Sequence, residues 1–342
     1  MNRFGWMMRR ELWEHRAIWA APLVVLALLL VAALAGNVFE TRIQINADDG
    51  PGADSGLTEE DVKELESIRG PEDLHKLETL DKLKDSATEG EVRTLEAGEA
   101  LAQVSVEKRV GLLVVAYAAV SAVMFMVLGV IGTFYALDAL YADRRDRSVL
   151  FWKSLPLSDT ETVLSKFCVA SVVIPLIAAA AAIAGQLIVA TGGSIKLGLT
   201  GGAAGWMWMP EVLGGGAFAA VLLAIVCALW YAPVTAYLLL ASAWAPKSPF
   251  LWAGLPPIAL AMIEKIAFGS DHVNSLLKDR MLAPIKMLFD DERVGDAPVQ
   301  AMDIAGNISG LLASPGMLLG LVAAAALLAG VVWVRRYRDE TT

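Results

Sequence analysis

Long apolar runs separated by short charged segments dominate the hydropathy pattern of the chain. A helix needs roughly 20 mostly apolar residues to cross the hydrocarbon core of a bilayer. Stretches without any Asp, Glu, Lys or Arg cover residues 17–39, 110–137, 167–195, 212–246, 248–263 and 304–334. The stretch 248–263 is weak, because it contains Pro256-Pro257 and reaches Glu264 before it would finish crossing. The other five are long enough to span a membrane.

The basic residues decide whether the weak stretch also crosses. They precede the first apolar run and follow the second, the fourth and the last. These clusters are Arg3, Arg9, Arg10 and Arg16, then Arg144, Arg145, Arg147 and Lys153, then Lys247, and finally Arg335, Arg336 and Arg338. The positive-inside rule places all of them in the cytoplasm. Both termini are then cytoplasmic, which requires an even number of crossings, so the weak stretch must cross as well.

The sequence therefore predicts an all-α membrane protein with six transmembrane helices and both termini in the cytoplasm. The predicted spans are residues 17–39, 110–137, 166–190, 213–243, 250–268 and 314–334. Between them lie an acidic helical extracytoplasmic segment (40–109), a cytoplasmic loop (138–165), a glycine-rich extracytoplasmic or re-entrant loop (191–212), a short cytoplasmic loop (244–249) and an extracytoplasmic loop (269–313). A cytoplasmic helix (1–16) and a cytoplasmic tail (335–342) complete the chain.

The first sixteen residues favour an interfacial elbow helix. Trp6 and Trp13 lie among arginines, a combination that suits the headgroup level of a bilayer. An ordinary anchor flanking the first span is the alternative. A signal peptide cleaved near Ala35 is disfavoured, because the apolar run is longer than the usual signal-peptide core.

Composition supports a membrane protein. Hydrophobic residues make up 56% of the chain and charged residues only 19%, whereas soluble domains carry about a quarter charged residues. Segment 40–108 contains 19 acidic and 8 basic residues, so it accounts for the net charge of −9. Thr58–Asp61 and Thr88–Glu91 match capping boxes, which predicts a small helical cap between the first two spans. Nothing in this distribution indicates nucleic-acid binding.

Catalytic and metal-binding motifs are missing. The chain has no GxxxxGK[ST], HExxH, GxSxG or CxxC, and its three histidines are scattered. Cys168 and Cys227 lie in apolar runs and are interpreted as packing residues. We therefore expect neither an enzyme nor a cofactor-binding or metal-binding chain.

A few polar or aromatic residues are candidates for a substrate pathway or gate, and each has a structural alternative. Gln186 lies in the third span and either faces a pathway or bonds to a neighbouring helix. Trp206 and Trp208 in the glycine-rich loop either touch substrate or belong to a membrane-interface belt. Glu264 and Lys265 form either a gate or a plain helix end at the outer boundary.

The loop 138–165 contains an apolar run, Val149-Leu150-Phe151-Trp152, between a basic cluster and Pro156. Ser158 and Glu161 after it match an S-x-x-E capping box, which would start the third helix. Four consecutive apolar side chains on a short helix point in several directions, so one buried face cannot cover them all. Aromatics near arginines are typical of interface hot spots. A partner surface is favoured, and packing against the chain's own span ends is the alternative.

The same loop resembles the first cytoplasmic loop of ABC-2 type permeases, the membrane subunits of bacterial ATP-binding-cassette exporters. The residues that carry the resemblance are Asp143, Arg144, Arg145, Asp146, Arg147, Phe151, Ser154, Leu155, Pro156, Ser158 and Lys166. Six spans, internal termini and an N-terminal elbow agree with that family. Asp143 is a departure, because many relatives have Glu there.

The resemblance implies a multi-pass protein of the bacterial cytoplasmic membrane whose loop is a coupling helix. The expected partners are two copies of a separate ATPase, which would bind ATP and Mg²⁺, and a second permease, with a homodimer favoured. The implied coupling residues are Asp143, Arg144, Arg145, Arg147, Val149, Leu150, Phe151, Trp152, Ser154, Leu155 and Pro156. Apolar spans favour export of an amphipathic substrate such as a peptide, an antibiotic or a lipid-like molecule. The alternative is a mechanotransmitting subunit that acts on an extracytoplasmic partner and transports nothing.

Overall fold

The computed structural model describes residues 3–35, 106–146, 158–199, 203–286 and 313–338, and every regular element in these ranges is a helix. The elements are α1 (Arg3–Glu14), α2 (Ala17–Ala35), α6 (Val106–Arg145), α8 (Asp159–Cys168), the π-helical turn η2 (Val169–Val173), α9 (Ile174–Leu199), the 3-10 turn η3 (Gly205–Trp208), α10 (Pro210–Trp230), α11 (Ala232–Trp244), α12 (Pro249–Phe268), α13 (His272–Lys286) and α15 (Pro315–Arg338). Six helical stretches in the described ranges are long and apolar enough to cross a membrane. The prediction of an all-α, multi-pass membrane protein is confirmed to that extent.

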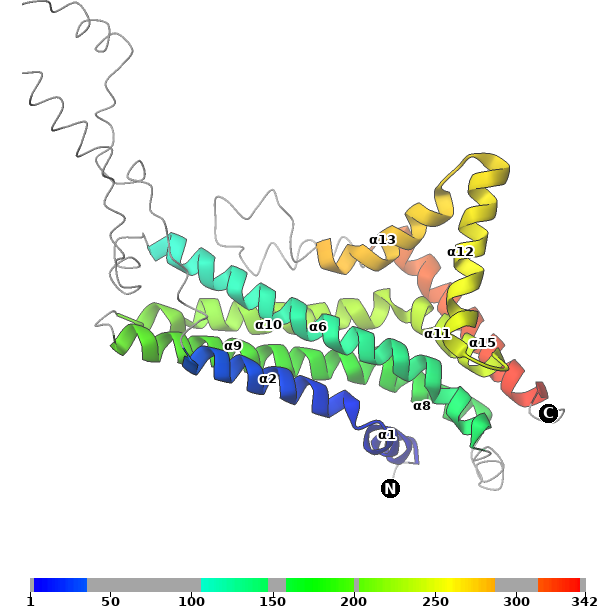
Figure 1. Cartoon of the computed structure of the whole chain (residues 1–342), viewed down its shortest axis with the longest axis horizontal. Coiled ribbons are helices and arrows are strands. Elements are labelled where there is room, and N and C mark those ends of the chain that lie inside the picture. The colour runs from blue at the N-terminus through cyan, green and yellow to red at the C-terminus, as the bar shows by residue number, and fades with distance from the viewer. Residues whose placement is uncertain (1–2, 36–105, 147–157, 200–202, 287–312, 339–342) are drawn as a thin grey trace, which may run out of the picture.

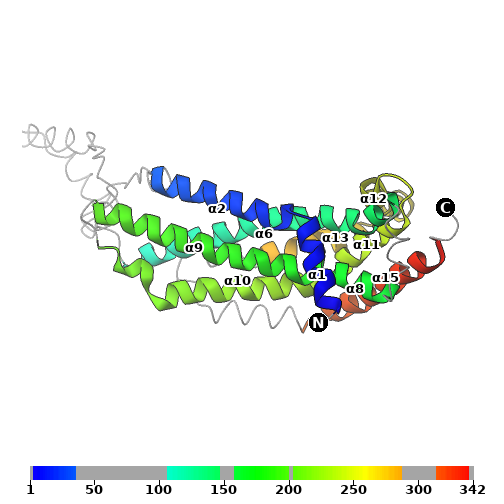
Figure 2. The same cartoon turned by 90° about the horizontal axis from the view of Figure 1, so that it is seen from below.

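The helices α2, α6, α9 and α10 run side by side along the length of the molecule (Figure 1). At one end α11 packs along α15, while α12 and α13 form a V that stands away from the bundle (Figure 1). The described ends of the chain and the start of α8 lie toward this same end in both views (Figures 1 and 2). This arrangement is compatible with an even number of crossings. The side of the membrane remains a prediction.

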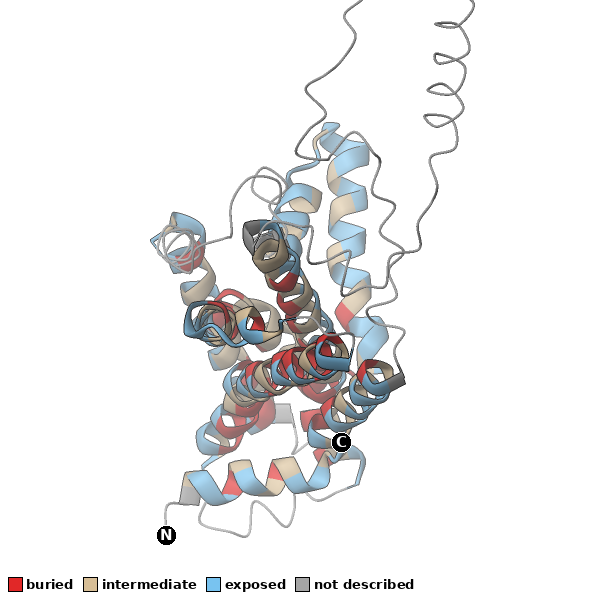
Figure 3. Cartoon of the chain, turned by 90° about the vertical axis from the view of Figure 1, so that its left-hand side faces the viewer, coloured by how far each residue is buried: buried red, intermediate tan, exposed pale blue. Residues whose placement is uncertain are grey.

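The α1 helix lies across the long helices, as the end-on view shows (Figure 3). Met7 and Glu11 are its buried residues, and Met8 and Leu12 pack against the core. Trp6 and Trp13 on the other side are exposed. The helix predicted in residues 1–16 is therefore present as α1, which packs one side against the core. Its position at a bilayer surface remains a prediction.

The third span is longer than predicted. Together α8, η2 and α9 run without a break from residue 159 to residue 199, so the chain is still helical in the segment 191–199 that was predicted as a loop. Gly192 explains part of this difference, because a Cβ there would lie only 2.8 Å from the Cβ of Ala33. Gly192 thereby lets α2 approach α9 closely, which is a common use of small residues between membrane helices. The sequence pattern did not distinguish this use from a flexible loop.

The fourth apolar run, predicted as one helix over 213–243, is two helices that meet at Tyr231. Pro233 supplies the physical reason. Proline has no backbone N–H and cannot donate to the carbonyl of Leu229 four residues earlier. The chain bends there, and α11 continues as a 13-residue helix against α15.

The weak fifth stretch forms the helix α12, which has 20 residues and continues through Pro256 and Pro257. Pro257 cannot donate to the carbonyl of Ala253. The hydroxyl of Tyr237 on α11 donates to that carbonyl instead, at 2.9 Å. A neighbouring helix thus satisfies the backbone group that the proline leaves open, as membrane helices require.

Other bounds also differ from the sequence prediction. The second helix extends to Arg145, and α15 continues to Arg338 through most of the predicted tail. The predicted outer loop 269–313 begins with α13. The acidic cap lies outside the described residues, apart from the start of α6. In the described membrane segments, the third span is the most enclosed, with 44% of its most apolar part buried, compared with 6% for α12.

Candidate functional site: a buried charge cluster beside the α6–α8 connection

The start of α8 is fixed by a reciprocal capping box. The backbone N–H of Glu161 donates to the hydroxyl of Ser158 at 3.1 Å, and the Glu161 carboxylate accepts the Ser158 N–H at 3.0 Å. Each bond satisfies an N–H that a helix start leaves open. The capping box predicted from the sequence is confirmed, and it defines the point at which the connection from α6 enters the third span.

Two turns further along α8, Lys166 is buried between two carboxylates. Its ammonium lies 2.9 Å from Glu11 of α1 and 3.5 Å from Asp143 of α6. The lysine side chain is 4% exposed and that of Glu11 6%, so this ion pair is removed from solvent. A buried charge has to be compensated by hydrogen bonds and an opposite charge. The sequence placed Lys166 at a helix end and did not indicate these partners.

Arg335, near the end of α15, extends the cluster. Its guanidinium lies 3.3 Å from Asp143 and 3.1 Å from Asp159, the first residue of α8. Asp143 thus forms ion pairs with both Lys166 and Arg335 and connects the two halves of the cluster. The charged side chains of this cluster are Glu11, Asp143, Asp159, Lys166 and Arg335.

Tyr135 completes the environment of Glu11. Its hydroxyl donates to the second carboxylate oxygen at 3.0 Å. The ring of His15 lies edge-on to the Tyr135 ring at 4.7 Å. Both oxygens of Glu11 are therefore engaged, one by Lys166 and the other by Tyr135. As a result, α1 is attached to both α6 and α8 through one side chain.

A second link ties the same end of α6 to α11. The Arg144 guanidinium donates to the carbonyls of Ser242 and Ala245 at 2.7 and 2.8 Å. The Ser242 hydroxyl in turn accepts from the backbone N–H groups of Leu140 and Tyr141. An arginine at the last carbonyls of a helix is favourable for both hydrogen bonding and the helix dipole. Arg144 therefore stabilises the end of α11.

These contacts revise the interpretation of the predicted coupling residues. Asp143 points into the protein, and Arg144 contacts α11, so neither presents its whole side chain to a partner. Arg145 is exposed and pairs with Asp146. The other predicted coupling residues lie outside the described part of the chain; they are Arg147, Val149, Leu150, Phe151, Trp152, Ser154, Leu155 and Pro156.

Among the pathway candidates, Gln186 is buried and bonds to neighbouring helices. Its amide lies 3.2 Å from the Ser121 hydroxyl on α6 and 3.3 Å from the Gly216 carbonyl on α10. A Cβ at Gly216 would come within 2.9 Å of the amide oxygen, so the glycine makes this contact possible. The geometry agrees with the packing alternative for Gln186.

The remaining candidates do not meet at one place. Trp206 packs in an apolar cluster, and Trp208 donates to the Ser194 hydroxyl at 2.7 Å. Glu264 accepts the backbone N–H groups of His272 and Val273, which begin α13, while Lys265 is exposed and pairs with Asp271. A carboxylate at a helix start is a common cap. The contacts of Glu264 agree with the helix-end alternative, because its carboxylate is used by the first backbone N–H groups of α13.

The charge cluster was missed in the sequence because its members are far apart along the chain. A weak signal existed, since Glu11 is an acid amid basic residues and Lys166 and Arg335 sit at span ends. Within the described ranges, no group of His, Cys, Asp or Glu is arranged to hold a metal ion, and neither cysteine forms a disulfide. Comparisons with known protein families, curated proteins and solved structures find no match for this chain.

Proposed function

We propose that this chain is the membrane permease subunit of an ATP-binding-cassette exporter. In this proposal the segment 147–157 docks into a separate ATPase and transmits its movements to the membrane helices. The proposal rests on the resemblance of residues 143–166 to ABC-2 permeases and on six helices long and apolar enough to span a membrane. The chain would act with two ATPase copies and a second permease, and it would export an amphipathic substrate from the bacterial cytoplasm.

The observation that carries the proposal is the position of the charge cluster at both ends of the α6–α8 connection. Asp143 lies just before the connection, and Asp159 and Lys166 lie just after it. Through Glu11 and Arg335 the same cluster holds α1 and α15. A displacement of the connection would therefore move the ends of four helices together.

Energetics support this mechanical role. Removing one partner of a buried ion pair costs about 3–5 kcal/mol, because the other charge is left uncompensated. The cluster therefore resists separation of its helices when a partner pushes on the connection. The apolar run at Val149–Trp152 would provide the contact itself, since buried aromatic anchors carry much of the binding energy of interfaces.

The proposal is tested by replacing Phe151 and Trp152 together with alanine and coexpressing the chain with a candidate cassette ATPase from the same genome. We expect the double variant to insert into the membrane but to lose copurification with the ATPase. A matched control replaces two exposed aromatics elsewhere, Phe218 and Phe268, which are 47% and 80% exposed. Undiminished copurification and transport in the Phe151/Trp152 variant would contradict the proposed docking.

Export and mechanotransmission are separated by a second measurement on the reconstituted complex. An exporter should show ATPase activity stimulated by its substrate and movement of that substrate into or out of vesicles. A complex that hydrolyses ATP in response to an extracytoplasmic partner, with no substrate movement, would favour the mechanotransmitting alternative.

A further inference from the structure

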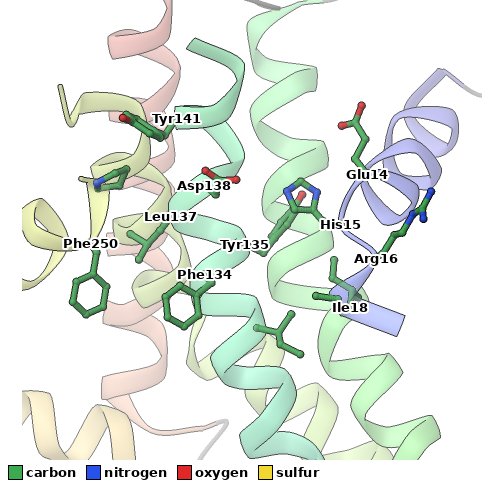
Figure 4. A pocket seen from close by; sticks show the side chains of 13 residues that line it. Glu14, His15, Arg16, Ile18, Phe134, Tyr135, Leu137, Asp138, Tyr141 and Phe250 are labelled. Carbon is green, nitrogen blue, oxygen red and sulfur yellow. The ribbon is translucent and has the colours of Figure 1, made fainter. Parts of the chain in front are cut away.

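A groove of about 660 Å³ lies between the α1–α2 corner, one face of α6 and the start of α12 (Figure 4). It is next to the charge cluster but is lined mostly by different side chains, apart from Tyr135 and His15, whose ring nitrogen lies 4.0 Å from a carboxylate oxygen of Glu11. Neither ATPase docking nor the helix contacts described above uses it. Its lining therefore calls for an explanation of its own.

The groove is polar at one end and apolar at the other. Ile131, Phe134, Asp138 and Tyr141 line it from α6, and their spacing of three or four residues places them on one helix face. Tyr141 and Asp138 lie toward the end of α6 that leads to the α6–α8 connection, and Phe134 lies further into the bundle (Figure 4). The division matches an amphiphile whose headgroup lies near the connection.

The apolar end is open and aromatic. The rings of Phe134 and Phe250 are stacked with centroids 6.4 Å apart, and these residues are 59% and 66% exposed within the chain. Ile18, which is fully buried, forms part of the opposite wall. An acyl chain lying along this surface would cover the two rings, as expected in a hydrocarbon environment.

The polar end carries both signs of charge. Arg16, in the turn between α1 and α2, and Asp138 on α6 both line it, with His15 between them (Figure 4). Within the described residues neither Arg16 nor Asp138 forms an ion pair, although Arg145 attracts Asp138 at longer range, whereas Glu14 is already paired with Arg10. A ligand for this end would need an anionic group for Arg16 and a cationic donor for Asp138.

We propose that the groove binds a phosphatidylethanolamine molecule from the leaflet nearest the α6–α8 connection. Its phosphate would face Arg16 and His15, its ammonium would donate to Asp138, and one acyl chain would lie along Phe134 and Phe250. A phosphatidylglycerol headgroup carries no cation for Asp138, and a choline headgroup has no N–H to donate. This lipid site goes beyond the proposed export function and does not depend on the ATPase.

The site is tested by native mass spectrometry of the full chain, with phosphatidylethanolamine, phosphatidylcholine and phosphatidylglycerol of identical acyl chains. The wild type should retain the ethanolamine lipid in preference to the other two. Asp138→Asn should reduce its preference over the choline lipid about tenfold, since a tenfold ratio corresponds to about 1.4 kcal/mol, the scale of a hydrogen bond to a charged group. Arg16→Gln should weaken binding of all three lipids.

The matched control is Asp279→Asn, which removes the same charge from an exposed position on α13 and should leave the lipid preference unchanged. A phosphatidylethanolamine with a diazirine on its acyl chain gives a readout that needs no variant, and it should label peptides from α6 and α12. Equal retention of the three lipids, an unchanged preference in Asp138→Asn, or labelling spread evenly over the exposed helices would overturn the proposal. Disulfide trapping of Phe134→Cys to a second copy would also overturn it, because the groove would then be a protein interface.

Discussion

The ammonium of Lys166 on α8 lies 2.9 Å from the carboxylate of Glu11 on α1, although 155 residues separate them in the chain. Both side chains are almost completely buried. This ion pair makes the N-terminal helix an integral part of the cytoplasmic-facing end that the topology predicts. It also provides the most direct test of the charge cluster.

Lys166→Met should destabilise the protein by about 3–5 kcal/mol, because Glu11 would remain buried without its cation. Thermal or denaturant unfolding in detergent measures the loss. Adding Glu11→Gln should recover part of it, since the second change removes the uncompensated charge. Lys265→Met serves as control, because that lysine side chain is 68% exposed and pairs only at the surface. A Lys166→Met variant as stable as this control would show that the pair does not hold α1.

The approach of α2 to α9 predicts opposite effects for two glycines of the same helix. Gly192→Ala would put a Cβ 2.8 Å from Ala33 and should destabilise the protein by about 1–3 kcal/mol through overpacking. Gly198→Ala meets no atom within 4 Å, so it should be neutral or stabilise by up to about 1 kcal/mol through helix propensity. Unfolding midpoints of the two variants compare these effects directly. Equal shifts would mean that α2 and α9 are not in close contact.

Tyr237→Phe should remove the donor that satisfies the Ala253 carbonyl in α12. We expect a loss of about 1 kcal/mol of stability, the usual net value of one hydrogen bond. Pro257→Ala restores the helical donor to that carbonyl, so Tyr237→Phe should cost less in this background. The double-mutant cycle therefore measures the coupling between a proline and the tyrosine that compensates for it. Strict additivity would argue against this relationship.

The topology is tested by single cysteines at positions 85 and 147. A membrane-impermeant maleimide should label Asp85→Cys in intact cells, because residues 40–109 are predicted outside. Arg147→Cys should react only after the membrane is opened, because the positive-inside rule places it in the cytoplasm. The reverse pattern would invert the predicted orientation.

Element type was predictable because it depends on local composition. Runs of apolar residues longer than a bilayer requires can satisfy their backbone groups in lipid only as helices. The six helical stretches and the Ser158–Glu161 capping box followed from such patterns. Boundaries were less predictable where glycine or proline had two uses. Gly192 lies within a helix at a close approach, and Pro233 divides an apolar run that contains no charged residue.

The candidate site was only partly visible for a different reason. Asp143 and Lys166 belong to the motif that resembles ABC-2 permeases, but the sequence suggested that Asp143 faces a partner. The structure turns it inward, where Lys166 and Arg335 compensate its charge. No local pattern indicates that Glu11 and Arg335, at opposite ends of the chain, share this aspartate's environment.

The sequence by itself determined the class of the protein, the six stretches long and apolar enough to span a membrane, and the start of α8. Hydrophobic run length and capping chemistry act over a few residues, so they can be read directly from the chain. The tertiary structure alone decided which charges pair, which glycines lie at helix contacts and where an amphipathic groove opens. Those features depend on side chains from different helices, many of them more than a hundred residues apart in the chain, and only packing of the helices sets their distances.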